Sequence, residues 1–433
     1  MFSDDGVAVS PEMQNEQQTA EEPYPFGTYD GLLLHSRYQR VRAEGRLCPV
    51  RMPYGDRALL ATRYADVRAV LGDPRFGRTI PAGLDQPRVT PEVLPLGLME
   101  MDPPDHTRIR RLIASAFTPR RADRQRPSTR RLAERLIDDM IASGGSADLV
   151  KGFAFPLPIG VICDLLGVPY DDRDEFHTWV VAMNELASGQ ADESRMENIG
   201  RMMAYLSGLI AERRAVPTDD LIGKLVRDTD EGAEENDRLG DDELVFLSML
   251  LLVGGYETTA NQIGNFVYLL LTHPDQLELL RRRPELLPGA VEELLRYTPL
   301  AVSAMYPRYA RSEVVLGNED EAGTDRYAEA GDAVSVVAEG CPVLTSTAAA
   351  NRDPRVFPDP DRLDITRDAA GHLGFGHGAH HCVGASLARM ELQVALGRLL
   401  ERLPGLRLAV GPRSIAWQPN LLFRGPVELP VTW

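Results

Sequence analysis

The most informative stretch of this 433-residue chain is Gly374-Phe375-Gly376-His377-Gly378-Ala379-His380-His381-Cys382-Val383-Gly384. Its first half is a glycine-rich loop, and an apolar pattern at helical spacing then runs through residues 385–400. Cys382 therefore stands at a helix start, where unpaired amides and the helix dipole stabilise a thiolate, the form of cysteine that ligates metal. Because glycine lacks a Cβ, three positions let the backbone approach a flat, bulky partner closely: Gly376, Gly378 and Gly384.

Haem is the flat partner that this loop favours, but two other interpretations fit the same residues. A lone cysteine on a helix is most often a buried structural residue. A zinc site is the second alternative, although its ligands would lie too close in sequence to wrap a tetrahedron comfortably: His377, His380, His381 and Cys382.

The composition is that of a globular protein with an acidic surface. Hydrophobic residues make up 43% and charged residues 26%, which excludes the disordered and fibrous classes. Lys+Arg 47 against Asp+Glu 64 leave a net charge of −17, so the surface repels nucleic acid and anionic membranes. The longest apolar stretch, residues 245–253, falls short of the roughly 18 residues that a membrane span requires. We expect no nucleic-acid or membrane partner.

The cysteines also indicate the cellular compartment. They lie far apart and form no Cys-x-x-Cys pair, which argues against a disulfide framework, zinc ribbons and covalent c-type haem. The start of the sequence has no charged-then-apolar leader pattern. We therefore expect a soluble, cytoplasmic protein.

Helical periodicity dominates the middle of the chain, from residue 64 to about residue 297. Alternating patterns predict a short hairpin within residues 50–63 and strands at 313–316, 333–337 and within 406–433. Residues 1–22 are acidic and polar and are interpreted as a disordered tail. The fold class is mainly α with small β-sheets, and residues 23–433 form one domain because no stretch has the length of an interdomain linker.

The pattern Phe375-x-x-Gly378-x-x-x-Cys382-x-Gly384 resembles the haem-thiolate signature of the cytochrome P450 superfamily. The resemblance extends over nearly the whole chain from about residue 23, and it is to a soluble bacterial, actinomycete-like member. It implies the cytochrome P450 fold, a single triangular helical domain around a buried haem b (iron protoporphyrin IX). It also implies that Cys382 ligates the iron and that three neighbours contact the cofactor: Phe375, Gly376 and Gly384.

The long apolar helix carries a second motif, Gly254-Gly255-Tyr256-Glu257-Thr258-Thr259. Each glycine inside a helix costs about 1 kcal/mol relative to alanine, so something must need the space. By resemblance, Glu257 and Thr258 are the catalytic acid-alcohol pair that delivers protons to dioxygen at the haem. The alternative is a threonine that bonds back to the carbonyl four residues earlier, beside a solvated glutamate.

A third motif, Glu293-Leu294-Leu295-Arg296, places an acid and a base on one helix face. On the sequence alone this is most simply an exposed ion pair worth a few tenths of a kcal/mol. The resemblance implies instead a buried structural pair, which Arg362 completes and which holds the loop that presents Cys382.

Haem carries two propionates, and buried anions need forked or imidazole donors. His106 and Arg110 lie on one helix face after a Pro-Pro stop, and they resemble the family's propionate clamp. Arg308 and His380 stand at the other family positions for propionate contact. Taken singly, each of these four residues would be an ordinary solvated or packing residue.

A basic run follows the Pro-Pro stop and consists of Arg108, Arg111, Arg120, Arg121, Arg124 and Arg126. Charge runs are usually solvated, but the family places this segment on the cysteine side of the haem. We therefore interpret it as a docking patch for an acidic electron donor. Residues 317–340 depart from the family pattern, being longer and more acidic, and form either a surface excursion or a cover for the substrate channel.

The resemblance implies a monooxygenase, an oxidoreductase that uses O2 and two electrons to hydroxylate or epoxidise its substrate. Electrons come from NAD(P)H through a separate ferredoxin and ferredoxin reductase, and the enzyme is expected to be a monomer. The alternatives are a peroxygenase driven by hydrogen peroxide and a non-catalytic haem- or ligand-binding sensor.

The substrate is expected to be a bulky, largely hydrophobic small molecule of specialised metabolism, such as a polyketide or macrolide of antibiotic biosynthesis. The segments expected to face it are residues 76–98, 183–203, 250–258 and 299–305 and the loop near Gln418. The named pocket candidates are Gly254, Met183 and Val302, with Glu185 and Asp192 as contacts for a basic group.

Overall fold

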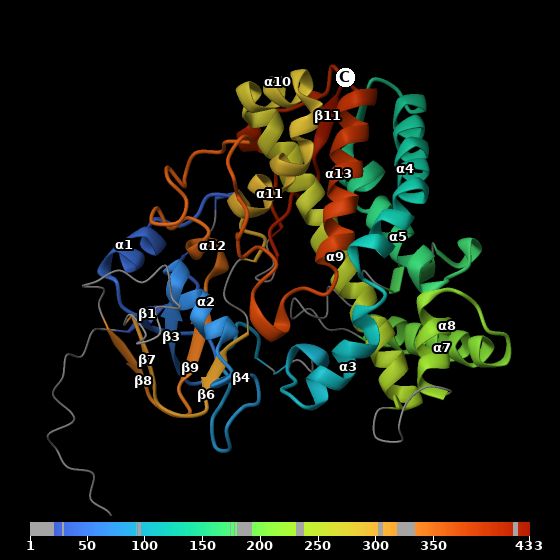
Figure 1. Cartoon of the computed structure of the whole chain (residues 1–433). Coiled ribbons are helices and arrows are strands. Elements are labelled where there is room, and N and C mark those ends of the chain that lie inside the picture. Colours follow the sequence, from blue (N-terminus) through green and yellow to red (C-terminus); the bar gives the residue numbers. More distant parts are fainter. Residues whose placement is uncertain are drawn as a thin grey trace, which may run out of the picture.

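The computed structural model describes residues 21–27, 30–91, 93, 97–173, 175–176, 178–179, 193–230, 238–301, 306–317, 334–418 and 423–433. Helices gather on one side of the molecule and the largest sheet on the other, and the segment that leads into the last long helix crosses between them (Figure 1). The mainly α fold with small sheets is as predicted.

Most of the helices make up the helical side (Figure 1). They are α3 (Asp105–Ala114), α4 (Pro119–Ala142), α5 (Pro156–Leu166), α7 (Glu193–Ala215), α8 (Leu221–Asp230), α9 (Asp241–Thr272), α10 (Pro274–Arg282), α11 (Leu287–Tyr297) and α13 (Ala385–Arg402). Helices α1 (Ser36–Glu44), α2 (Tyr64–Gly72) and α12 (Thr347–Ala350) lie with the largest sheet (Figure 1).

Helix α9 is the axis of the helical side, and α5, α7 and α13 pack against it. It begins cleanly because the Glu243 carboxylate accepts a hydrogen bond from the Gly240 N–H at 2.9 Å, and three acidic residues in its first turn favour the positive end of the helix dipole. Within the described part of the chain, α9 is the one helix long and apolar enough to cross a membrane. However, 61% of that stretch is buried inside the protein, as expected of a core helix.

The largest sheet has the strand order β1-β2-β3-β9-β6-β4. Its strands are β1 (Glu22–Pro23), β2 (Cys48–Arg51), β3 (Arg57–Ala61), β9 (Pro342–Thr345), β6 (Arg308–Ala310) and β4 (Phe76–Gly77). β2 and β3 form the antiparallel hairpin predicted within residues 50–63. The pairing of β6 with both β4 and β9 matters for the site, because it brings distant segments to one edge of the molecule.

Two smaller sheets complete the fold. β10 (Arg407–Leu408), β11 (Pro430–Thr432) and β5 (Ser146–Asp148) form one, and β7 (Val314–Leu316) and β8 (Ser335–Val337) form the other. β7, β8, β10 and β11 lie in the three segments where the sequence predicted strands. β5 was not predicted, because it lies within the part of the chain where helical periodicity dominates. Between β7 and β8, residues 318–333 lie outside the described residues, so the role of the long 317–340 segment stays a prediction.

The amino-terminal boundary differs slightly from our expectation. Residues 1–20 lie outside the described residues, but Glu22, which we assigned to the tail, pairs with Val50 in the largest sheet. Glu22 also forms an ion pair with Arg40 at 2.7 Å. The folded chain therefore includes the acidic pair before Pro23.

The two glycines of the α9 motif have different surroundings. A Cβ on Gly254 would meet nothing within 4 Å, whereas a Cβ on Gly255 would lie 3.2 Å from Cδ1 of Ile162 on α5. Gly254 thus borders open space, as a pocket residue should, and Gly255 allows α5 and α9 to approach each other.

We expect Gly254→Ala to raise the free energy of unfolding by about 1 kcal/mol, because alanine favours a helix interior and its Cβ has room here. Gly255→Ala should gain less, since Ile162 must move to admit the methyl group. Urea unfolding followed by circular dichroism measures both. A Gly254→Ala protein less stable than the parent would contradict the open space at this position.

Candidate active site

The Cys382 loop is folded by its own backbone. The Cys382 N–H donates to the Phe375 carbonyl at 2.9 Å, and α13 begins immediately after the loop, with Gly384 as its N-cap. A Cβ on Gly384 would lie 3.9 Å from the Cys382 sulfur. The Cys382 side chain is accessible, although it lies deep among protein atoms. The prediction that this cysteine stands at a helix start is confirmed.

The helix start stabilises the thiolate only in part. Burial raises the pKa of the Cys382 thiol, while N–H groups at the helix start and nearby guanidinium groups act in the opposite direction. Full ionisation needs a further positive charge, and a metal cation at the sulfur would supply it. This donor chemistry fits a haem iron.

One of the loop glycines, Gly378, has a structural role that we did not predict. Gly378 has φ +70°, and a Cβ there would lie 2.2 Å from the Leu71 carbonyl oxygen at the end of α2. Gly376 also has a left-handed φ, +73°. Gly378 therefore lets the loop cross the end of α2. The cofactor contacts of Gly376 and Gly384 stay predictions.

A charged network that the sequence analysis missed supports Phe375. The Arg389 guanidinium lies 4.6 Å from the centre of the Phe375 ring and donates to Glu292 at 2.8 and 2.9 Å. The Gly374 N–H donates to His372 Nδ1, so the His372 Nε2–H donates to Glu292 at 3.1 Å. Burial acts to raise the pKa of Glu292, but the hydrogen bonds from His372 and Arg389 lower it to about 2. The network ties α11 and α13 to the cysteine loop.

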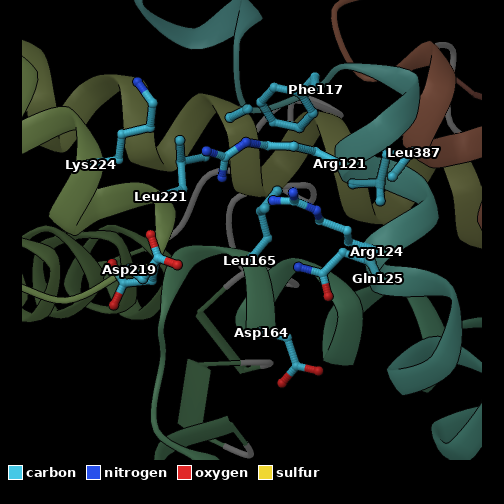
Figure 2. A pocket seen from close by; sticks show the side chains of 13 residues that line it. Phe117, Arg121, Arg124, Gln125, Asp164, Leu165, Asp219, Leu221, Lys224 and Leu387 are labelled. Carbon is cyan, nitrogen blue, oxygen red and sulfur yellow. The ribbon is translucent and has the colours of Figure 1, made fainter.

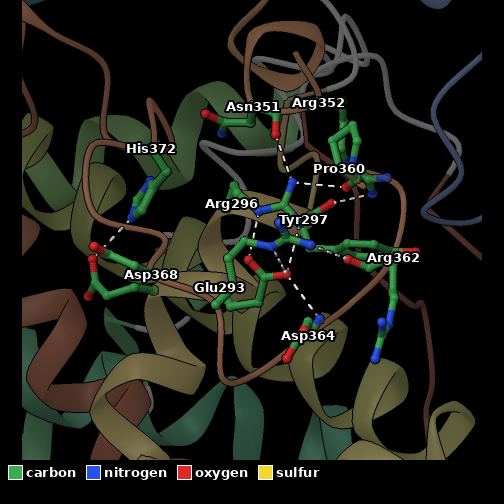
Figure 3. A network of polar contacts seen from close by, with 12 residues as sticks. Glu293, Arg296, Tyr297, Asn351, Arg352, Pro360, Arg362, Asp364, Asp368 and His372 are labelled. Carbon is green, nitrogen blue, oxygen red and sulfur yellow. Dashed lines mark hydrogen bonds and ion pairs between the residues drawn. The ribbon is translucent and has the colours of Figure 1, made fainter. Parts of the chain in front are cut away.

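Glu293 and Arg296 form the buried pair that the resemblance implied (Figure 3). Arg296 donates to both Glu293 oxygens at 2.7 and 2.8 Å and to the carbonyls of Asn351 and Pro360 at 2.7 and 3.0 Å. Neither side chain of the pair is exposed. The Asp364 N–H also donates to Glu293, at 3.1 Å. The pair therefore holds the long segment between α12 and the cysteine loop.

The third partner of this pair is Arg367, and our assignment of Arg362 was wrong. Arg367 Nε lies 3.2 Å from Glu293 Oε1. Arg362 is exposed, and Figure 3 shows its guanidinium directed away from Glu293. Both arginines lie on the same loop, and the turn around Asp364 brings only the later one back towards the pair.

Three of the predicted propionate donors meet beside the cysteine loop. The rings of His106 and His380 stack with centroids 4.0 Å apart, and Arg308 comes from β6. Within the described chain, Nε2 of both histidines and Nε and Nη2 of Arg308 are enclosed and have no hydrogen-bond partner. Burial, followed by the charge of Arg308, lowers the pKa of His380 to about 2, and burial lowers that of Arg308 to about 10. Unpaired buried donors of this kind fit the carboxylates of haem.

Arg110 lies near this group but is engaged differently. Its Nη2 donates to the His381 carbonyl in the cysteine loop. The residue is about half-buried on α3, one turn after His106. Arg110 thus joins α3 to the cysteine loop.

On α9 the acid and the alcohol have distinct environments. Glu257 is buried, and burial raises its pKa to about 7. The Thr258 hydroxyl donates to the Gly254 carbonyl at 2.7 Å, which is the backbone bond of the alternative interpretation. That bond uses the hydroxyl proton and leaves the oxygen able to accept a hydrogen bond from another group. The other pocket candidates, Met183 and Val302, and the expected contacts Glu185 and Asp192 lie outside the described residues.

The zinc alternative finds no support in the described residues, where no three His, Cys, Asp or Glu side chains gather as a metal site. The loop histidines point to different neighbours: His377 lies against Gly72, His380 stacks on His106, and His381 lies near Phe375. Cys382 is therefore the one candidate metal ligand in this loop. A single protein ligand suits an iron whose other bonds are made by a porphyrin ring.

The family model described as Cytochrome P450 matches residues 33–404. The chain belongs to the cytochrome P450 family. It is 48% identical to mycinamicin IV hydroxylase/epoxidase of Micromonospora griseorubida over 96% of this chain and 100% of that protein. It is 45% identical to nocardicin C N-oxygenase of Nocardia uniformis subsp. tsuyamanensis, with the same two coverages.

Solved structures of related cytochromes P450 have the same fold as this chain. The mixed-function P450 MycG superposes with a TM-score of 0.86 at 47% identity, covering 96% of this chain and 100% of that one. The LnmA cytochrome P450 hydroxylase of Streptomyces atroolivaceus gives 0.83 at 45% identity, with coverages of 95% and 100%. The family resemblance and the fold predicted from the sequence are confirmed, and the chain is an oxygen-incorporating oxidoreductase of the haem-containing family.

We expect Gly378→Ala to lower the free energy of unfolding by more than about 2 kcal/mol, because the new Cβ would be both strained and in collision with Leu71. Gly83→Ala is the matched control: Gly83 also has a positive φ, +84°, but nothing lies within 4 Å of its Cβ position, so only the backbone cost of about 1 kcal/mol remains. Equal losses in the two variants, measured by urea unfolding, would contradict the contact with α2.

Proposed function

We propose that this chain is a haem-thiolate monooxygenase that hydroxylates or epoxidises a bulky macrolide- or polyketide-type metabolite with O2 and two electrons. The observation that carries the proposal is the set of enclosed, unpaired imidazole and guanidinium donors beside the accessible Cys382 sulfur. Relatives at 48% and 38% identity named mycinamicin IV hydroxylase/epoxidase and 6-deoxyerythronolide B hydroxylase support the substrate class.

Different residues of the site are proposed to bind the iron and the propionates of haem. Cys382 provides the thiolate ligand, and His106, Arg308, His380 and Arg110 bind the two carboxylates. When bound, haem supplies the redox-active iron at which dioxygen is activated. The protein contributes the shape of the loop, the charge balance and the protons.

Protons are supplied from α9. A carboxyl group with a pKa of about 7 holds a proton at neutral pH and releases it easily, as a general acid should. Glu257 is the proton reservoir in this proposal. In this proposal Glu257 releases the protons for the dioxygen site. Thr258 donates its own proton to the Gly254 carbonyl, which fixes its oxygen as a hydrogen-bond acceptor beside the open space at Gly254.

Electrons come from NAD(P)H through a ferredoxin and its reductase, in the cytoplasm. The basic run is the proposed docking surface, and part of it borders a hollow of about 190 Å³ near the start of α13 (Figure 2). Figure 2 shows Arg121 and Arg124 reaching across this hollow below Phe117, with Leu387 at its edge. Arg108 is less suited to docking, because it is mostly buried and pairs with Glu243. Exposed arginines attract the acidic surface of a ferredoxin.

The decisive experiment is a substrate titration of the ferric holoprotein followed by turnover. Mycinamicin IV and nocardicin C are the probes, and we expect the macrolide to shift the Soret band. With ferredoxin, reductase, NADPH and O2, the macrolide should gain one oxygen atom. Turnover with hydrogen peroxide alone would favour the peroxygenase alternative. Tight binding without oxygen consumption would favour the sensor.

The buried carboxyl of Glu257 predicts a pH-dependent stability. Its pKa is raised in the folded protein, so its contribution to stability is complete below about pH 4.5 and is lost as the pH rises through about 7. Relative to Glu257→Gln, the parent should lose about 2–3 kcal/mol between pH 5 and pH 8. Urea unfolding at several pH values measures this. Glu278→Gln, at an exposed site on α10, is the control and should follow the parent. Parallel pH profiles for the parent and Glu257→Gln would contradict the raised pKa.

A further inference from the structure

Arg78 is a basic residue beside the active site that none of the recognised motifs includes. It follows β4, the edge strand that pairs with β6. The residue is largely buried, and its Nε atom is enclosed without a hydrogen-bond partner in the part of the chain that the structure describes. A buried guanidinium with a free donor is costly, so its position needs an explanation.

The protein holds the Arg78 side chain in place but does not neutralise it. Its Nη1 donates to the Tyr306 carbonyl at 2.9 Å, and its Cζ lies 5.4 Å from the centre of the Tyr306 ring. A carbonyl and an aromatic ring orient a guanidinium and contribute no negative charge. No ion pair of Arg78 with a carboxylate occurs among the described residues.

The nearest acidic anchor, Asp102, is occupied by other groups. Its carboxylate accepts the backbone N–H of Arg78 at 2.9 Å, the N–H and hydroxyl of Thr79 at 2.8 Å and Nη2 of Arg311 at 2.9 Å. Burial acts to raise the pKa of Asp102, but these hydrogen bonds lower it to about 2. Asp102 also lies just before α3, which carries His106. It therefore fixes the Arg78 backbone to the start of α3 and leaves the Arg78 Nε–H unpaired among the described residues.

The charges around Arg78 are the donors already assigned to the haem carboxylates. Gly77 pairs with Tyr309 in antiparallel register, so Arg78, the next residue, comes beside Arg308 at the edge of the largest sheet. Asp102, which accepts the Arg78 N–H, lies just before the helix that carries His106, and the His106 ring stacks on His380 at 4.0 Å. Burial and then the charge of Arg308 also lower the pKa of Arg78 to about 9. Basic side chains from β6, α3, the cysteine loop and the segment after β4 thus converge on one region, in which the Asp102 carboxylate is already engaged. Enclosed cations with unpaired donors define a site for an anion.

We propose that Arg78 is a further cofactor-binding residue, whose free Nε–H donates to a haem propionate alongside Arg308, His106 and His380. The inference rests on the haem-binding function proposed above. It assigns to this chain one more positive charge at the cofactor than its motifs account for. That charge also disfavours the oxidised iron relative to the reduced iron, and so raises the reduction potential.

The same segment shows how an arginine behaves without this role. Arg75, just after α2, is exposed and forms a forked ion pair with Asp73 at distances down to 2.5 Å. Its charge is thereby neutralised locally, at the surface. Arg75→Gln is therefore a matched control for Arg78→Gln, with the same chemical change in the same stretch of chain.

The test uses substrate-free ferric holoprotein and two readouts that do not depend on turnover. The first is the rate of haem transfer to excess apomyoglobin, and the second is the reduction potential from spectroelectrochemistry. We expect Arg78→Gln to lose haem about tenfold faster, as for the loss of a charge-assisted hydrogen bond, and to show a lower potential. Arg78→Lys should restore most of the potential, because it keeps the charge, but only part of the retention. Arg75→Gln should match the parent.

Two outcomes would overturn the proposal. One is an Arg78→Gln protein that matches Arg75→Gln in both haem loss and potential. The other is a change confined to substrate affinity, which would place Arg78 in the substrate pocket. If Arg78→Gln does not accumulate with haem, Arg78→Lys decides: faster haem loss with unchanged unfolding of the apoprotein supports the role, and parental haem loss refutes it. A parent that binds no haem at all would refute the proposed function itself.

Discussion

The fully buried ion pair of Glu293 and Arg296 is the interaction on which the active-site half of the fold depends. Two buried charges are tolerated only when every polar atom around them is satisfied. Here the guanidinium reaches two backbone carbonyls beyond its partner, and the carboxylate accepts a backbone N–H and a second arginine. The charged pair therefore dictates the path of a loop that has little regular structure. Asn351 continues this path by accepting the Leu373 N–H at 2.7 Å, directly before the cysteine loop.

Three arginines show how scaffold and site differ in charge balance. Arg296 has a carboxylate partner and carbonyl acceptors, so its charge is balanced within the protein. Arg308 and Arg78 are enclosed with donors left over, and they come together with His106 and His380 beside the cysteine loop. A group of such donors in one place indicates where a negatively charged group binds.

The sequence predicted the features that depend on local spacing and failed where the answer depended on three-dimensional position. The helix after Cys382 and the hairpin around residues 50–63 follow from patterns within a few residues. The spacing of Glu293 and Arg296 also predicted that they pair, but it favoured an exposed pair, and only the family resemblance implied the burial that the structure has. Local patterns could not predict that Arg367 rather than Arg362 pairs with Glu293, because this depends on how a turn folds back onto α11. The function of Gly378 was missed for a similar reason, since its neighbour Leu71 is remote in sequence. Glu292 directly precedes the Glu293–Arg296 motif, and Arg389 lies on the helix after Cys382. Their opposite charges could have predicted the ion pair that they form.

The polar contacts that shape the cysteine loop have a consequence for how the enzyme matures. The hydrogen bonds of Glu293, Arg296, Glu292 and His372 are made entirely between protein groups. The loop can therefore adopt its final form on the ribosome-released polypeptide before any porphyrin arrives. Little of the haem-binding free energy is then needed to order this segment, because the loop is already folded. In a cell short of iron, the apoprotein would keep this loop folded and could bind haem later.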